Sequence, residues 1–269
     1  MKKYSARIGC YPGPKGSFAD SLARKLFDAE PEYMDTIPDA FLSVENGRLD
    51  YCIVPSETKM HILTMIDRMF LETKNVLASK KIYVPVEFSL AGFGNVGEIE
   101  RIYSKEEAFE QCMKYIFEKV SQAKKIKTGS TAEMLKNIGD KEAVICSSAA
   151  AEKYGIPIIE KNIALGLTSF LVLSGKDSEY EKGKEYSSFL IYGIEGANEY
   201  GTLENSLRKI FTENKANLKS IISTPLNGEY AFSIWMDGHR NEKNIYNALK
   251  EAKENTKFFR FCGSCEVER

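Results

Sequence analysis

Strand-like and helix-like segments alternate along the first 175 residues, and this alternation constrains the fold more than any other feature of the sequence. Short apolar runs at 51–55 and 168–173 have the character of buried strands. Segments such as 18–27 and 105–120 have apolar residues at the spacing of amphipathic helices. Repeated strand–helix units favour parallel sheets with helices on their faces, so we predict an α/β fold.

Two such series follow one another, and this predicts two lobes. The β-rich segments 81–90 and 168–173 are the candidates for strands that pass from one series to the other. We expect one lobe from about residues 1–85 with 168–176, and a second lobe from residues 86–167. A cleft between two lobes is the default place for a small ligand.

The region after residue 185 has a different order of segments. Residues 175–185 (GKDSEYEKGKE) are polar and charged, which is typical of a linker. Strands are then predicted at 186–194, 218–223, 230–236 and 257–262, and helices at 203–212 and 241–252. The Asn-Gly dipeptide after Leu226 predicts a hairpin turn between the middle strands. The resulting order βαββαβ is ferredoxin-like and predicts a separate domain.

Charge and hydropathy narrow the class of function. The chain has 37 lysines and arginines against 38 aspartates and glutamates, which argues against nucleic acid as the main partner. No apolar run approaches the roughly 20 residues that a membrane-spanning helix needs. The N-terminal Met1-Lys-Lys-Tyr4 leads into a strand without an apolar signal region. We therefore expect a cytoplasmic protein with no membrane or nucleic-acid partner.

The six cysteines do not predict a metal centre. Only Cys262 and Cys265 have the spacing of a metal or redox pair. One pair supplies two ligands, whereas structural zinc normally takes four, and no motif links His61 or His239 to it. We expect reduced core cysteines and no metal.

Several short motifs occur in an order that resembles the prephenate dehydratase family. Gly13-Pro-Lys-Gly-Ser-Phe18 resembles Gly-Pro-x-Gly-Thr-Phe, and Val54-Pro-Ser-Glu57 resembles Val-Pro-Ile-Glu-Asn. Ser130-Thr-Ala-Glu133 matches a Ser-Thr-Ala segment, and Thr168-Ser-Phe170 stands where the family has Thr-Arg-Phe. In the C-terminal region, strings such as Gly201-Thr-Leu203 resemble the ACT domain attached to these enzymes. Each match is weak alone, but their common order indicates homology.

This resemblance implies a fold and a reaction. It implies a two-lobed, periplasmic-binding-protein-like catalytic domain at residues 1–176 and a ferredoxin-like ACT regulatory domain at residues 186–269. The reaction would be decarboxylative dehydration of prephenate to phenylpyruvate, in L-phenylalanine biosynthesis, without a cofactor. A homodimer or homotetramer and an amino-acid effector, phenylalanine, are further implications.

The resemblance also assigns residues. Thr168 corresponds to the threonine near the leaving hydroxyl, so the expected catalytic residues are Thr168, Ser130 and Glu57. The expected substrate-binding residues are Ser17, Thr58, Thr131, Ser169 and Phe170. The expected effector-binding residues are Leu203, Asn217, Leu218 and Ser223.

Structural roles remain open for the same side chains. Thr168 is also an ordinary β-branched strand residue, and Ser130 and Thr131 would cap a helix well. Glu57 could be a solvated loop carboxylate.

Differences from the family motifs are concentrated at the residues expected to bind the substrate and the effector. Ser169 replaces an arginine and Thr58 replaces an asparagine, while Ile222-Ser-Thr-Pro225 replaces Glu-Ser-Arg-Pro in the effector segment. A hydroxyl does not supply the permanent charge of a guanidinium. Two alternatives to a dehydratase therefore stay open: a non-aromatising prephenate decarboxylase, and a non-catalytic sensor of small molecules.

Overall fold

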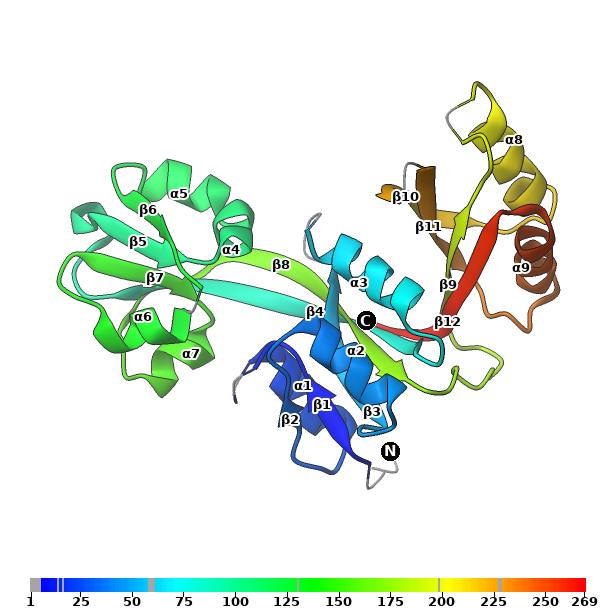
Figure 1. Ribbon diagram of the computed structural model, residues 1–269. Helices are drawn as coiled ribbons and strands as arrows, with labels where there is room; N and C mark the ends of the chain where they lie inside the picture. The colour runs from blue at the N-terminus through cyan, green and yellow to red at the C-terminus, as the bar shows by residue number, and fades with distance from the viewer. Residues whose placement is uncertain are drawn as a thin grey trace. The chain divides into compact units, whose positions relative to one another are not determined.

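The chain forms two compact units (Figure 1). In the computed structural model the described residues are 6–13, 15, 17–57, 61–129, 131–197, 199–226 and 229–269. The first unit consists of Met1–Tyr83 with Ser169–Arg269, and the second unit is Val84–Thr168. No helix in the described part of the chain is long and apolar enough to cross a bilayer.

The N-terminal part of the first unit is an α/β layer. Its strands are neighbours in the order β4-β8-β3-β1-β2, with β1 parallel to both β2 and β3 and antiparallel pairing between β3 and β8. The bounds of its elements are β1 (Ile8–Cys10), α1 (Phe18–Leu26), β2 (Glu32–Tyr33), α2 (Ile37–Glu45), β3 (Tyr51–Glu57), α3 (His61–Glu72), β4 (Leu77–Gly92) and β8 (Ile158–Ser174). Residues of β4 and β8 belong to both units.

Local sequence explains where these helices begin. Ser17 caps α1 by accepting a hydrogen bond from the Asp20 N–H at 3.2 Å, and Thr36 caps α2 by accepting one from the Asp39 N–H at 3.1 Å. A proline in the first turn of α2 removes a donor that would have no partner there. The apolar faces of α2 and α3 bury Phe41 and Phe70, whose rings pack edge to face with their centroids 4.9 Å apart.

The C-terminal region forms a four-stranded antiparallel sheet with helices. Its elements are β9 (Tyr186–Gly193), α8 (Thr202–Leu207), the π-helix η2 (Arg208–Thr212), β10 (Leu218–Leu226), β11 (Glu229–Asp237), α9 (Lys243–Asn255) and β12 (Phe258–Glu268). The strand order is β10-β11-β9-β12. This arrangement confirms the predicted order βαββαβ.

The C-terminal region packs closely on the N-terminal part of the same unit. The end of β12 pairs in parallel with β4, where Glu266 lies opposite Lys80. The Arg260 guanidinium donates to the carbonyl of Phe70 at 3.1 Å and to that of Val76 at 2.7 Å. One hydrophobic cluster therefore contains residues from both sides, including Phe70 and Trp235.

The second unit is a smaller α/β layer of its own. Its central strand β5 pairs in parallel with β6 and β7, and β7 pairs antiparallel with the end of β4. Its elements are η1 (Val96–Glu98), β5 (Arg101–Ser104), α4 (Glu106–Gln111), α5 (Met113–Lys119), β6 (Lys124–Lys127), α6 (Thr131–Asn137), β7 (Glu142–Cys146) and α7 (Ser148–Lys153). The predicted α/β class is confirmed in both units.

Several segments differ from the sequence-based prediction, and the last strand, expected at 257–262, extends to Glu268. The strand expected at 168–173 begins much earlier, at Ile158. Its first half was not predicted because Lys161 and Asn162 interrupt the apolar pattern, and Asn162 also has a φ of +55°. The helix expected at 105–120 is broken at Cys112. The two-residue strand β2 carries only exposed side chains and has no periodic signal. The expected Asn-Gly turn at 227–228 lies outside the described residues.

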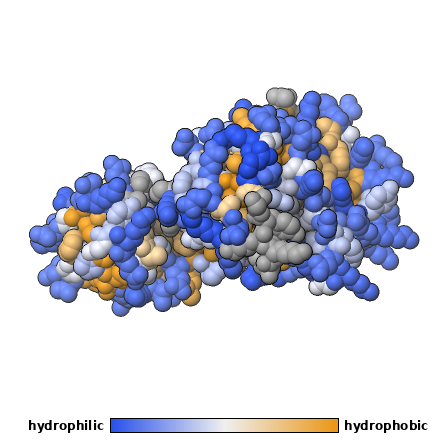
Figure 2. Space-filling model, turned by 90° about the horizontal axis from the view of Figure 1, so that it is seen from below, coloured by the Kyte–Doolittle hydropathy of each residue, from blue (hydrophilic) through white to orange (hydrophobic). Residues whose placement is uncertain are grey.

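The surface is mostly hydrophilic on the face shown in Figure 2, where apolar residues form separate patches. The most exposed large apolar side chains of the second unit are Phe117 at 80% and Leu165 at 75%. Isolated apolar side chains of this kind are normal on a protein surface.

Candidate active site

One edge of the N-terminal sheet brings several predicted site residues together. Strands β1 and β3 are parallel, with Cys10 opposite Ile53, so both strands end at the same edge. Strand β8 is antiparallel to β3 and starts its pairing there, with Ser169 opposite Glu57. Ligands of open α/β sheets bind outside the carboxyl ends of the strands. This edge is therefore the candidate active site of the first unit.

A β-bulge lies at the end of β3. Pro55 is opposite Phe170, and Glu57 is opposite Ser169, so Ser56 is an extra residue on this strand. The Ser56 Oγ lies 2.7 Å from the Ser169 Oγ, and the two side chains are 2% and 0% exposed. Neither hydroxyl is left without a partner in the core.

The segment 168–170 is largely buried. Thr168 is 9% exposed and Phe170 is 4% exposed. Successive side chains of a strand point to opposite faces, so Thr168 points away from the face that holds Ser169. No hydrogen bond of the Thr168 hydroxyl to a described side chain is observed, and the side chains of Glu57 and Thr58 are not among those described.

Ser17 has a structural role at the same edge. Its hydroxyl donates to the Pro12 carbonyl at 2.9 Å and accepts from the Asp20 N–H. The nearby Arg24 guanidinium contacts the buried Asp20 carboxylate at 2.9 Å and also pairs with Glu30. Ser17 therefore fixes the loop between β1 and α1, and its observed hydrogen bonds are these two backbone contacts.

The description of the predicted site residues is incomplete at three positions. Thr58 and Ser130 lie outside the described residues, and the structure gives the backbone but not the side chain of Glu57. Thr131 is half-buried and begins α6. Strands β5, β6 and β7 are parallel, so α6 follows β6 at the carboxyl edge of the second unit's sheet.

Serines at both sheet edges were not among the predicted site residues. Ser56 was not predicted, although it stands where the resembled motif has isoleucine. In the second unit, Ser147 caps α7 by accepting from the Ala150 N–H at 3.2 Å, and the Ser148 Oγ lies 2.8 Å from the Ser89 Oγ. A polar residue at a position that normally carries an apolar one was the available signal for Ser56.

The predicted effector residues lie on separate elements of the C-terminal region. Leu203 on α8 and Leu218 on β10 pack partly buried against its core. The Asn217 amide donates to the Asp237 carboxylate at 2.6 Å. Ser223 is exposed on β10, opposite Phe232. Leu203, Leu218 and Asn217 thus already have contacts within this region.

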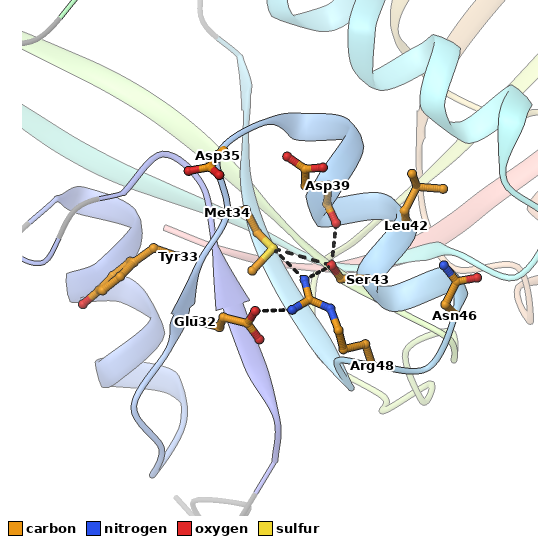
Figure 3. Close-up of a pocket in the computed structure, with 9 residues that line it drawn as sticks. All are labelled: Glu32, Tyr33, Met34, Asp35, Asp39, Leu42, Ser43, Asn46 and Arg48. Carbon is orange, nitrogen blue, oxygen red and sulfur yellow. Dashed lines mark hydrogen bonds and ion pairs between the residues drawn. The ribbon is translucent and has the colours of Figure 1, made fainter.

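A surface pocket of about 310 Å³ lies between β2 and α2 (Figure 3). Arg48 points into it and pairs with Glu32, and its guanidinium also donates to the Ser43 Oγ at 2.6 Å. Asp35 and Asp39 contribute further negative charge. None of the predicted site residues lines this pocket.

The cysteine pair is part of the core. Cys262 and Cys265 are both 0% exposed, and the Cys265 thiol donates to the Ala78 carbonyl at 3.3 Å. Burial raises the pKa of both thiols well above the ordinary value, because it disfavours the thiolate. Thiols in such surroundings are poor nucleophiles.

Comparison with known proteins agrees with the motifs and the fold. The prephenate dehydratase family model matches residues 10–178. The chain is 31% identical over 257 residues to a prephenate dehydratase of Lactococcus lactis subsp. lactis (strain IL1403), covering 90% of this chain and 91% of that protein. It is 30% identical over 266 residues to a bifunctional chorismate mutase/prephenate dehydratase of Aquifex aeolicus (strain VF5), covering 94% and 72%.

A solved structure shows the same fold. The prephenate dehydratase of Arthrobacter aurescens in complex with L-Phe superimposes with a TM-score of 0.81 at 24% identity, over 97% of this chain and 90% of that one. At this identity the likeness concerns the fold alone. Together with the family model and the two sequence relatives, it leads to one conclusion: the chain belongs to the prephenate dehydratase family.

Proposed function

We propose that this chain is a prephenate dehydratase that converts prephenate to phenylpyruvate in L-phenylalanine biosynthesis. Family membership supports the reaction, and Thr168 is the observation that carries the site. Its hydroxyl has no partner among the described residues and lies on β8, next to the residue that pairs with Glu57. A hydroxyl in this state is able to donate a hydrogen bond to a substrate.

The reaction needs orientation of the substrate and a hydrogen-bond donor to the hydroxyl that leaves. The bond between the ring and its carboxylate breaks, carbon dioxide leaves, and the electron pair enters the ring. Hydroxide then leaves from the opposite ring carbon, and the product ring is aromatic. We assign Thr168 as the hydrogen-bond donor to the departing hydroxyl, with Glu57 and Ser130 as further catalytic groups. This chemistry requires no metal or organic cofactor.

Substrate binding is assigned to the polar side chains that the family motifs indicate. We assign Ser17, Thr58 and Thr131 to the polar groups of the dianionic substrate, with Ser169 and Phe170 completing the segment around Thr168. Residues 1–176 would form the catalytic domain. A cytoplasmic location and the absence of nucleic-acid and membrane partners belong to the same proposal.

The C-terminal region is assigned to regulation. We propose that residues 186–269 form an ACT-type domain and that the protein is a homodimer or homotetramer. The Arthrobacter aurescens relative was solved with L-Phe, which suggests an amino-acid effector at Leu203, Asn217, Leu218 and Ser223. Titration calorimetry with L-phenylalanine tests this assignment.

The test of the reaction is product identification. Purified protein is incubated with prephenate at neutral pH beside a control without enzyme, because prephenate aromatises by itself in acid. We expect phenylpyruvate well above the control, by absorbance and mass spectrometry. A decarboxylated product that keeps its hydroxyl would instead identify a non-aromatising decarboxylase. Intact prephenate would contradict both enzymes and favour a sensor.

A further inference from the structure

Two of the chain's differences from the family motifs face each other in the structure. Ser56 stands where the motif has isoleucine, and Ser169 stands where it has arginine. The two residues are 113 positions apart in the chain, on β3 and β8. Their hydroxyl oxygens are 2.7 Å apart. The two substitutions therefore make one hydrogen bond, which we call the serine bridge.

The chemistry of burial couples these two residues. Both side chains are almost completely enclosed, at 2% and 0% exposure. A buried hydroxyl without a partner is costly, so isoleucine at position 56 would leave Ser169 unsatisfied. Arginine at position 169 would bring a guanidinium to a place that is closed to water. Each serine thus supplies the hydrogen-bond partner that the other buried hydroxyl needs.

The serine bridge lies where it controls backbone geometry. Ser56 is the extra residue of the bulge that ends β3, and bulges set the direction in which a strand continues. Ser169 follows Thr168 directly on β8. The bridge therefore ties the bulge to the strand position next to Thr168.

We propose that Ser56 and Ser169 are a pair of positioning residues for the reaction, acting through Thr168. In this chain the serine bridge supplies the fixed geometry at this point, without the positive charge of an arginine. Ser169 acts from inside the lobe, where its hydroxyl is held by Ser56. This inference rests on the proposed dehydratase function and adds to it a residue, Ser56, that the motifs did not indicate.

The test uses three variants and a matched control. Ser56→Ala and Ser169→Ala each remove half of the bridge, and the double variant removes both halves. Ser188→Ala is the control, because the Ser188 and Ser264 hydroxyls form a similar buried pair, 2.8 Å apart, in the C-terminal region. For each protein, kcat and KM for prephenate, the thermal midpoint and the product ratio are measured.

Positioning predicts a specific combination of results. Each single variant should lose about tenfold or more in kcat with little change in KM, because misplacement of a reacting group affects the transition state. A larger share of the product should retain its hydroxyl. The double variant should regain thermal stability, since no buried hydroxyl is left unpaired, but its kcat should stay as low as in the single variants. Ser188→Ala should keep the wild-type kcat and product ratio.

Two outcomes would overturn the proposal. If kcat recovers together with stability in the double variant, the bridge is only structural. If both single variants keep the kcat of the Ser188→Ala control, the bridge does not position the reaction at all.

A second measurement separates this inference from the proposed function. Backbone hydrogen exchange is followed in peptides covering 53–57 and 168–171, which needs no turnover. Faster exchange there in Ser56→Ala, but not in Ser188→Ala, would show that the bridge holds the bulge. If the wild-type protein were inactive on prephenate, the proposed function would fail while this result stood. Unchanged exchange would refute the bridge in an active enzyme as well as in an inactive one.

Discussion

At the scale of single residues, two neighbouring hydroxyls of β8, those of Thr168 and Ser169, differ in their observed contacts. Ser169 and Ser56 share a hydrogen bond in the core, whereas the Thr168 hydroxyl has no partner among the described residues. A buried hydrogen bond contributes only about 1 kcal/mol, but leaving one partner unsatisfied costs about 1–3 kcal/mol. The serine bridge is therefore hard to lose one residue at a time, while Thr168 can change without breaking an observed contact.

This contrast gives a prediction for Thr168. Thr168→Ala should lower kcat on prephenate by about a hundredfold, which is the lower end of the range for losing a side chain that assists a leaving group. Thr168→Ser keeps the hydroxyl and should retain most of the activity. Because no hydrogen bond between Thr168 and a described side chain is broken, the unfolding free energy should fall by only about 1 kcal/mol. Steady-state kinetics and thermal unfolding check both statements, and full activity in Thr168→Ala would remove this residue from the mechanism.

At the scale of elements, β12 approaches β4 so closely that one position requires glycine. Gly263 has a φ of +127°, which L-amino acids with side chains rarely adopt. A Cβ atom there would lie 2.2 Å from the Ala78 carbonyl oxygen on β4. The register of β12 with β9 shifts between Phe261 and Gly263, so a bulge and a close approach coincide. The attachment of the C-terminal region depends on this local geometry.

We therefore predict that Gly263→Ala is strongly destabilising. Strained backbone and a contact with backbone atoms that have little room to move should together lower the unfolding free energy by about 3 kcal/mol or more. Gly175→Ala is the control, because a Cβ atom there meets nothing within 4 Å and no positive φ is required. Urea unfolding of both variants measures the difference. Equal stability of the two would show that β12 and β4 separate easily.

At the scale of the whole molecule, buried polar contacts join the C-terminal region to the N-terminal part of the first unit. The Ser233 hydroxyl on β11 donates to the Asp67 carboxylate on α3 at 2.6 Å. Asp67 is 4% exposed, and burial raises its pKa to about 6, partly offset by this hydrogen bond. The nearby charged or titratable groups include Arg260, whose guanidinium binds carbonyls, and the thiol of Cys262. The junction thus contains a carboxylate that is poorly solvated at neutral pH.

The direction of its pH effect follows from linkage. The pKa of Asp67 is higher in the folded protein than the ordinary value of about 3.9, so the folded state binds the proton more tightly. The stability that proton binding by Asp67 contributes is fully present below the unfolded pKa of this carboxyl. It is lost as pH rises through the folded pKa of about 6. Asp67→Asn removes the charge, and asparagine can still accept from Ser233.

We predict that Asp67→Asn is more stable than wild type near neutral pH, by on the order of 1–3 kcal/mol. The difference should shrink towards about pH 4, where the wild-type carboxyl is protonated. Unfolding free energies measured across this range check the trend. Glu254→Gln, at an exposed position on α9, is the control for an ordinary surface carboxylate. A difference that grows on acidification would contradict the predicted burial of Asp67.

The sequence by itself determined the class of fold and the position of most elements. Helix periodicity, as in 18–27, and apolar runs such as 51–55 are local signals, and they predicted helices and strands close to those observed. The order of motifs also determined the family, and it directed attention to Thr168. Local signals failed where the apolar pattern was interrupted, as in the first half of β8, where Glu160, Lys161 and Asn162 follow one another.

Only the tertiary structure decided which distant residues meet. Ser56 and Ser169 were separate, unexplained differences until strand register placed their hydroxyls 2.7 Å apart. The contact between Asp67 and Ser233 joins residues 166 positions apart, across what the sequence predicted to be two domains. Register and packing depend on the simultaneous arrangement of several strands, and no local pattern contains that information. The chemistry of this site thus follows from pairings that the chain acquires only when it folds.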